Sequence, residues 1–128
     1  MKKHAVVSSR APRTLGPYSQ AIRCGGLVFL SGQLGIDPVS GMLAEGGVRN
    51  QTRQALDNLA AVLEAAGSRM DLLLKTTVYL RDMAHFQAVN DVYAERVGQP
   101  YPARAAVAVR ELPLGAEVEI EAVAAAEA

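Results

Sequence analysis

An arginine stands near the start of residues 101–109, a stretch with the pattern of a β-strand. Pro102 suits the entrance of a strand, where its missing N–H group does the least harm. Because side chains in a strand alternate between faces, Arg104, Ala106 and Ala108 should share one face. We therefore predict a buried strand in which two small neighbours leave open space in front of the Arg104 guanidinium group.

The guanidinium group of Arg104 is permanently charged, and its planar fork of donors matches a carboxylate or a phosphate in bidentate geometry. This chemistry indicates a pocket for a small anion. The competing interpretation is that Arg104 pairs with a glutamate of the same chain or extends to the surface. The strand pattern alone does not separate the two interpretations.

Three glutamates, Glu117, Glu119 and Glu121, alternate with aliphatic residues in a second strand pattern near the end of the chain. All three should point to the same face of the strand. We expect Glu117 and Glu121 to be solvated, whereas Glu119, in the middle of the strand, should be partly buried. A partly buried carboxylate can act as a base or hold a water molecule, so Glu119 is the candidate acid–base group.

Tyr18, Ser31 and Gly32 are weaker candidates for a site. Tyr18 follows a Gly-Pro turn signal. It could line a site, or its ring could equally be part of the core with only the hydroxyl group in contact with solvent. Ser31 and Gly32 end a predicted strand, where free backbone groups can contact a ligand and glycine allows close approach. The sequence contains no phosphate loop, dinucleotide fingerprint or metal-ligand spacing, so we expect neither a metal nor a cofactor.

Hydrophobic periodicity and turn residues predict the elements that would position these side chains. The predicted strands cover residues 6–7, 18–23, 27–31, 72–80, 101–109 and 117–125, and the predicted helices cover 46–66 and 82–97. The two helices are amphipathic and must cover one face of a mixed six-stranded sheet. The other face keeps apolar residues with no helix left to cover them, which predicts a homo-oligomer that associates sheet to sheet.

Length and charge narrow the class of protein. The chain has 128 residues and is predicted to form one domain, residues 1–128. Its 13 basic and 13 acidic residues cancel, and no basic patch suggests nucleic-acid binding. No apolar run approaches the ~20 residues that span a bilayer, and no signal-peptide pattern occurs. We therefore expect a cytoplasmic protein without a membrane partner.

Seven short motifs, taken together and in order, resemble the RidA (YjgF) family. They are Gly16-Pro17-Tyr18-Ser19-Gln20-Ala21, Ser31-Gly32-Gln33, Gln51-Thr52-Arg53-Gln54-Ala55-Leu56-Asp57-Asn58-Leu59, Lys75-Thr76-Thr77-Val78-Tyr79-Leu80, Val89-Asn90, Pro102-Ala103-Arg104 and Val118-Glu119-Ile120-Glu121-Ala122. The resemblance runs through nearly the whole chain, and the motifs are specific as a set although none is specific alone.

The resemblance implies an α+β protein with the chorismate-mutase-like (YjgF) fold, assembled as a homotrimer with ligand clefts between subunits. It also implies a deaminase that needs no metal or cofactor. Such an enzyme hydrolyses small imino acids, 2-iminopropanoate and 2-iminobutanoate, to 2-oxo acids and ammonia.

By match of position, the resemblance implies that Arg104 binds the substrate carboxylate and that Glu119 lies near the attacking water. The other substrate-binding residues implied by the resemblance are Tyr18, Ser31, Gly32 and Asn90. Ala106 stands where many members carry a cysteine, which excludes any thiol role at this position.

Two other functions are compatible with these motifs. A non-catalytic module that binds a small carboxylate or another metabolite would need the same arginine as an enzyme. Ribonuclease activity has been attached to some members of the family, but the neutral charge and the lack of a basic patch with aromatic residues argue against it here.

Overall fold

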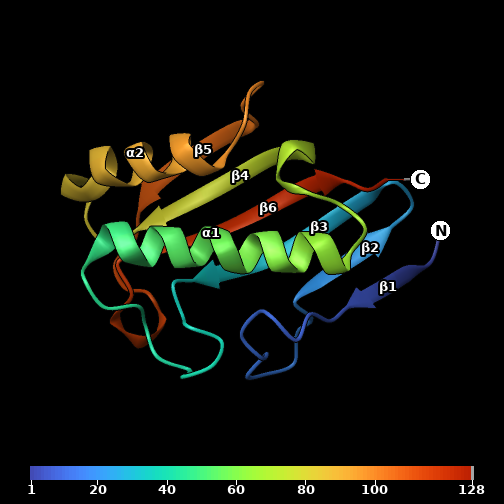
Figure 1. Ribbon diagram of the computed structural model, residues 1–128, viewed down its shortest axis with the longest axis horizontal. Helices are drawn as coiled ribbons and strands as arrows, with labels where there is room; N and C mark the ends of the chain where they lie inside the picture. The colour runs from blue at the N-terminus through green and yellow to red at the C-terminus, as the bar shows by residue number, and fades with distance from the viewer. Residues whose placement is uncertain (128) are drawn as a thin grey trace.

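The computed structural model describes residues 1–127, which form six strands and two α-helices (Figure 1). The strands are β1 (Lys3–Val6), β2 (Ala21–Cys24), β3 (Leu27–Leu34), β4 (Leu73–Leu80), β5 (Ala103–Ala108) and β6 (Val118–Ala125), and the helices are α1 (Val48–Ala65) and α2 (Phe86–Arg96). Their order along the chain is the predicted one: three strands, a helix, a strand, a helix and two strands.

The six strands form one mixed sheet in the order β1-β2-β3-β6-β4-β5. β4 and β5 are parallel and are connected through α2, whereas the other pairs in residues 1–127 are antiparallel. Both helices lie against the same face of the sheet (Figure 1). The predicted α+β class, with a mixed six-stranded sheet and two helices on one face, is therefore confirmed.

The hydrophobic core lies between the two helices and the sheet. Alternate residues of the strands point into it, among them Val118, Ile120, Ala122 and Ala124 of β6. Because side chains alternate along a strand, Glu119 and Glu121 must point to the opposite face, which no helix covers. The burial pattern thus separates a helix-covered face from an open face of the same sheet.

α1 ends at the predicted glycine. Gly67 has a positive φ of 76°, which favours glycine because it has no Cβ atom. Its backbone N–H donates to the carbonyl oxygen of Glu64, and the N–H of Ser68 donates to that of Leu63. This pair of bonds is the Schellman motif, which satisfies carbonyl groups that the last turn of a helix leaves free.

Several element boundaries differ from the prediction. β1 spans Lys3–Val6 rather than 6–7, and β2 begins at Ala21 because Tyr18 is still part of the preceding turn, where its N–H donates to the carbonyl of Gly16. α2 begins at Phe86 rather than near position 82. A short 3-10 turn precedes the helix, and Asp82 caps that turn by accepting a hydrogen bond from the N–H of Ala84.

β3 is longer than predicted and irregular. It continues to Leu34, and its pairing with β6 shifts register between Leu30 and Gln33. Ser31 and Gly32 therefore lie inside the strand at a bulge, and the prediction that they end it is wrong. A bulge changes the direction of the strand while its pairing in the sheet continues, and a pattern of alternating hydrophobicity does not reveal it.

β5 is the outermost strand, and the prediction that it is buried is wrong. Five of its six residues are exposed, with Ala106 half-buried. The strand pairs with β4 alone, so one of its edges is free. Its small aliphatic side chains are typical of a core strand, but within residues 1–127 nothing covers Ala103, Ala105 or Val107 on the open face.

Large apolar side chains are exposed on the open face. Cross-strand pairing places Phe29 of β3 beside Val123 of β6, and Leu27 beside Ala125. Phe29 is 47% exposed and Leu27 is 39% exposed.

Within residues 1–127 neither helix has the length and apolar character needed to cross a membrane.

Candidate functional site

Arg104 lies on the helix-covered side of β5, at the edge of the sheet. Its cross-strand partner is Thr76 of β4, whose side chain is buried under α2. The Nη1 atom of Arg104 donates to the Oδ1 atom of Asn90 at 2.7 Å. The guanidinium carbon lies 5.5 Å from the centre of the Phe86 ring and 5.0 Å from that of Tyr93, so both rings attract the cation.

The Tyr93 ring is itself held in place. Its hydroxyl forms a 2.7 Å hydrogen bond with the Oγ1 atom of Thr76 in the buried layer between α2 and the sheet. Burial raises the pKa of the Tyr93 phenol, which therefore stays protonated at neutral pH. A fixed ring, a second ring and an amide oxygen together define the direction of the Arg104 guanidinium group.

The charge of Arg104 is available to a ligand. Within residues 1–127 no carboxylate lies within 4.0 Å of its nitrogen atoms, which contradicts the interpretation that it pairs with a glutamate of the same chain. Arg104 and Asn90 line a cavity of about 350 Å³ with Tyr93, Ala94, Tyr101 and Pro102. We call Arg104, Asn90 and this cavity the arginine half-site. It can bind a small carboxylate.

Glu119 lies on the open face of the sheet, between the inward-facing Val118 and Ile120. The side chain is partly buried, as predicted. Burial raises the pKa of the Glu119 carboxyl group, and the negative charge of Glu121 raises it further. A carboxyl group with a raised pKa exchanges its proton nearer to neutral pH, as an acid–base catalyst must.

Gly32 and Tyr18 lie beside Glu119. All three line a second cavity of about 350 Å³, together with Arg13, Leu15 and other residues of the loop before β2. Tyr18 is 54% exposed there, which contradicts a core position for its ring. Ser31 does not line this cavity; its hydroxyl donates instead to the carbonyl oxygen of Ser19 at 2.6 Å. We call Tyr18, Gly32 and Glu119 the glutamate half-site.

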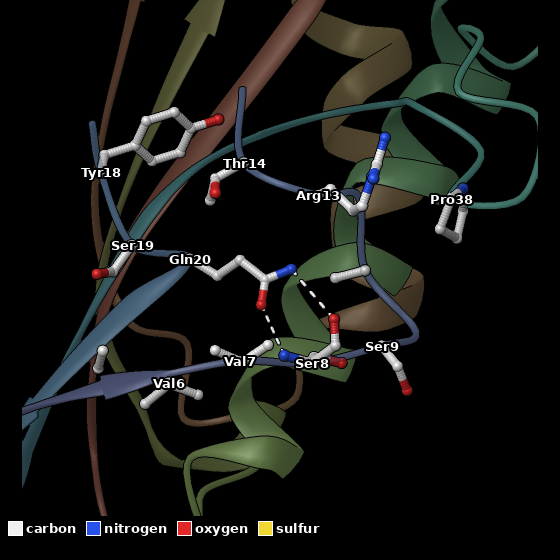
Figure 2. A pocket seen from close by; sticks show the side chains of 12 residues that line it. Val6, Val7, Ser8, Ser9, Arg13, Thr14, Tyr18, Ser19, Gln20 and Pro38 are labelled. Carbon is white, nitrogen blue, oxygen red and sulfur yellow. Dashed lines mark hydrogen bonds between the residues drawn. The ribbon is translucent and has the colours of Figure 1, made fainter. Parts of the chain in front are cut away.

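The loop that carries Tyr18 also borders another cavity, of about 650 Å³ (Figure 2). Gln20 points into this region and holds Ser8, accepting a hydrogen bond from its N–H and donating to its carbonyl oxygen. A second bond from the Gln20 amide reaches the carbonyl of Pro12. Gln20 thereby fixes the loop that positions Tyr18, and we assign the cavity no chemistry of its own.

The two half-sites do not meet within one chain. Arg104 points to the helix-covered side of the sheet and Glu119 to the open side, and β4 lies between their strands. The cavities that they line share no residue. The predicted site residues therefore form two groups, with Arg104 and Asn90 in one and Tyr18, Gly32 and Glu119 in the other.

Sequence reasoning missed several contacts of these groups. The aromatic rings of Phe86 and Tyr93 were not predicted as contacts of Arg104, although their spacing from Asn90 on one helix could have indicated a shared face. The prediction that Glu117 and Glu121 are solvated is wrong: both are half-buried, Glu121 accepts a hydrogen bond from the Tyr79 hydroxyl, and Glu117 lies 3.5 Å from Arg81. Within residues 1–127 no three His, Cys, Asp or Glu side chains are grouped so as to hold a metal ion.

Comparison with known proteins places the chain in a family. A family model described as Endoribonuclease L-PSP matches residues 8–126. A RutC family protein of Pyrococcus horikoshii is 48% identical over 122 residues, which are 95% of this chain and 97% of that protein. A Capra hircus protein named 2-iminobutanoate/2-iminopropanoate deaminase is 46% identical over 122 residues, which are 95% of this chain and 89% of that protein.

A solved structure agrees with these relatives. The crystal structure of RidA from an Antarctic Psychrobacter species superimposes with a TM-score of 0.92 at 41% identity, covering 95% of this chain and 98% of that one. The match of sequence, fold and length confirms the resemblance found in the motifs: the chain belongs to the Endoribonuclease L-PSP family, the family of the RidA (YjgF) proteins.

Proposed function

We propose that this protein hydrolyses small 2-imino acids, 2-iminopropanoate and 2-iminobutanoate, to 2-oxo acids and ammonia. The observation that carries the proposal is Arg104, a cation that has no acidic partner within residues 1–127 and is held by Asn90 and two aromatic rings. Such a preorganised guanidinium group suits a small carboxylate. Relatives that carry the deaminase name at 46% identity support the same substrate class.

The reaction needs few groups from the protein. A protonated imine is already electrophilic, so the protein has to orient it, place a water molecule and accept a proton. In the proposed mechanism Arg104 binds the carboxylate, and Glu119 takes a proton from the water that attacks the imine carbon. Glu119 returns this proton to the nitrogen of the resulting carbinolamine. The carbon–nitrogen bond then breaks as the hydroxyl group loses its proton to water and becomes the carbonyl of the 2-oxo acid, and the nitrogen leaves as ammonia. No step calls for a cofactor.

The proposed site lies between subunits. Arg104 and Glu119 point to opposite sides of one sheet, so a small substrate that touches both must lie between two copies of the chain. The exposed apolar residues of the open face support association through that face. We infer a homotrimer in which each cleft takes the arginine half-site from one subunit and the glutamate half-site from the next.

Mixing two inactive variants tests this arrangement. Arg104→Ala removes one half-site and Glu119→Gln removes the other, and the two proteins are unfolded together and refolded at equal concentrations. In a cyclic trimer every mixed assembly contains one cleft with both residues intact, so about a quarter of the wild-type rate should return. The assay follows ammonia and 2-oxo acid release from imines that an amino-acid oxidase generates.

Each variant refolded alone is the control, and refolded wild type sets the full rate. A mixture that stays inactive while wild type recovers would show that the two residues do not share an intersubunit cleft. A wild-type protein that does not accelerate imine hydrolysis, yet binds pyruvate through Arg104, would replace the deaminase with the non-catalytic binding module.

A further inference from the structure

Tyr79 and Glu121 form a contact on the open face that neither half-site uses. The Tyr79 hydroxyl on β4 donates a hydrogen bond to the Oε1 atom of Glu121 on β6. Tyr79 is also the cross-strand partner of Glu119 in the antiparallel pairing of β4 with β6. The Tyr79 side chain therefore links the position of Glu119, the candidate acid–base group, to Glu121, the next carboxylate on the same face of β6.

The two glutamates nearest to Glu119 in the chain have different surroundings. Glu117 precedes β6, and its carboxylate lies 3.5 Å from the Nη1 atom of Arg81 and 3.5 Å from the Nε2 atom of His85, so it is turned toward these nitrogens. Glu121 is bonded to a neutral phenol, and within residues 1–127 it forms no ion pair. Its negative charge therefore remains largely uncompensated beside Glu119.

The other elements packed around Glu119 bring little charge. β3 contributes Gly32 and Gln33 to the cavity of the glutamate half-site, and the whole of that strand carries no ionisable side chain. The turn at Pro113–Gly115 is likewise without charge. The loop before β2 brings one cation, Arg13, at the wall of the cavity, and β4 brings a second, Lys75, which lies opposite Val123 on the open face. Glu121 is thus the nearby anion able to act on Glu119.

We infer that Tyr79 and Glu121 are a pair of positioning residues that sets how readily Glu119 exchanges its proton, an inference that rests on the proposed role of Glu119 in imine hydrolysis. Tyr79 fixes the Glu121 carboxylate by its hydrogen bond. Glu121 in turn makes a second negative charge at position 119 unfavourable, which keeps that carboxyl group poised to take and return a proton. Neither Tyr79 nor Glu121 has to touch the substrate.

The electrostatic consequence has a definite sign. Removing the charge of Glu121 makes ionisation of Glu119 easier, so the pKa of Glu119 falls and the acidic limb of the pH–rate profile moves to lower pH. Charges two residues apart on one face of a strand, about 7 Å, should move that limb by roughly half a pH unit or more. Removing the Tyr79 hydroxyl frees the Glu121 carboxylate to turn away from Glu119 and should move the limb in the same direction by a smaller amount.

The test compares Glu121→Gln with Glu117→Gln, the same change of residue just before β6, where the carboxylate lies against Arg81 and His85 and not beside Glu119. The carboxyl groups are titrated by ¹³C NMR on glutamate-labelled protein, with the Glu119 signal assigned by its loss in Glu119→Gln. We expect the Glu119 midpoint to fall in Glu121→Gln and to move by less than half as much in Glu117→Gln. The pH dependence of kcat/KM should follow the same order.

Tyr79→Phe provides a second variant if Glu121→Gln does not fold, and the Glu119 midpoint should fall in it by less than in Glu121→Gln. The inference is overturned if Glu121→Gln leaves the Glu119 midpoint unchanged, if both glutamine variants shift it equally, or if Tyr79→Phe raises it. Because the NMR titration needs no substrate, it separates this failure from failure of the proposed function. An inactive wild-type protein with the expected midpoints would refute the deaminase while leaving the electrostatic coupling established.

Discussion

Gly32 and Glu119 approach each other so closely that position 32 has no room for a side chain. A Cβ atom on Gly32 would lie 2.9 Å from the carboxyl carbon Cδ of Glu119 and 3.1 Å from its Cγ atom. The absence of a side chain at the bulge of β3 therefore allows the Glu119 carboxyl group to lie against the backbone. This contact connects the shape of the bulge to the position of the candidate acid–base group.

Gly32→Ala should reduce activity with little loss of stability. The atoms in the way belong to the end of a flexible side chain, so Glu119 can rotate aside while the backbone stays in place. A displaced carboxyl group no longer aligns the water, and kcat/KM should fall at least about tenfold. The free energy of unfolding should change by less than about 1 kcal/mol. Steady-state kinetics and urea denaturation measure the two quantities.

Gly35→Ala is the matched control, because the same change of residue meets backbone instead. A Cβ atom there would lie 2.4 Å from the carbonyl oxygen of Gln51 in α1. The helix would have to move away from the sheet, at a cost of more than about 2 kcal/mol of stability. If Gly32→Ala proved as destabilising as Gly35→Ala, the loss of activity could not be assigned to the carboxyl group of Glu119.

Asn90→Ala should weaken substrate binding through Arg104. The amide oxygen of Asn90 accepts a hydrogen bond from the guanidinium group at 2.7 Å, and a bond to a charged group contributes about 1.5–3 kcal/mol. Its loss frees Arg104 to leave the orientation that the Phe86 and Tyr93 rings help to define. We expect kcat/KM to fall by roughly tenfold or more, mainly through a higher KM.

Gln87→Ala is the control for this helix. Gln87 also forms a side-chain hydrogen bond on α2, but its partner is the half-buried Asp91 and not the arginine half-site. Its removal should leave KM within about twofold of wild type. Equal effects of the two substitutions would indicate that α2 as a whole, rather than the contact with Arg104, controls binding.

Glu119→Gln should stabilise the protein, increasingly so as the pH rises. The folded-state pKa of Glu119 is raised, so the unfolded chain releases this proton at a lower pH than the folded protein does. Between the two pKa values the folded state binds more protons, and stability falls as the pH increases. Glutamine carries no charge and escapes this penalty.

Melting temperatures measured from pH 4 to pH 8 at one protein concentration check this prediction. The difference between Glu119→Gln and wild type should be small at the acidic end and should grow towards neutral pH. A difference that stays constant over the range would show that the ionisation of Glu119 does not oppose folding. A group that lowers stability when charged is expected at a functional site.

The alternation of residues 118–125 illustrates what can be predicted from sequence. Buried and half-buried positions follow one another along β6 as the pattern of glutamates and aliphatic residues indicates, and Glu119 is partly buried as expected. The shared face of Arg104 and Ala106 is likewise confirmed by their pairing with Thr76 and Val78 on the helix-covered side. These features depend on neighbours within a few residues, which a sequence pattern records directly.

The same kind of pattern failed for residues 103–108. A run of small aliphatic residues predicted a buried strand, and β5 is exposed at the edge of the sheet. Burial depends on which strand lies alongside, and that depends on packing between segments far apart in the chain. The residues are nevertheless consistent with a strand that another copy of the chain covers.

The sequence by itself determined the class of fold, the order of the elements and the residue types at the site, because hydrophobic periodicity and turn chemistry are local. Only the tertiary structure decided which of those residues lie together. The order of the strands places Arg104 and Glu119 on opposite sides of one sheet, and the pairing of β4 with β6 brings Tyr79 next to Glu119 and Glu121. Contacts of this kind join positions about 40 residues apart, and no short-range pattern specifies them.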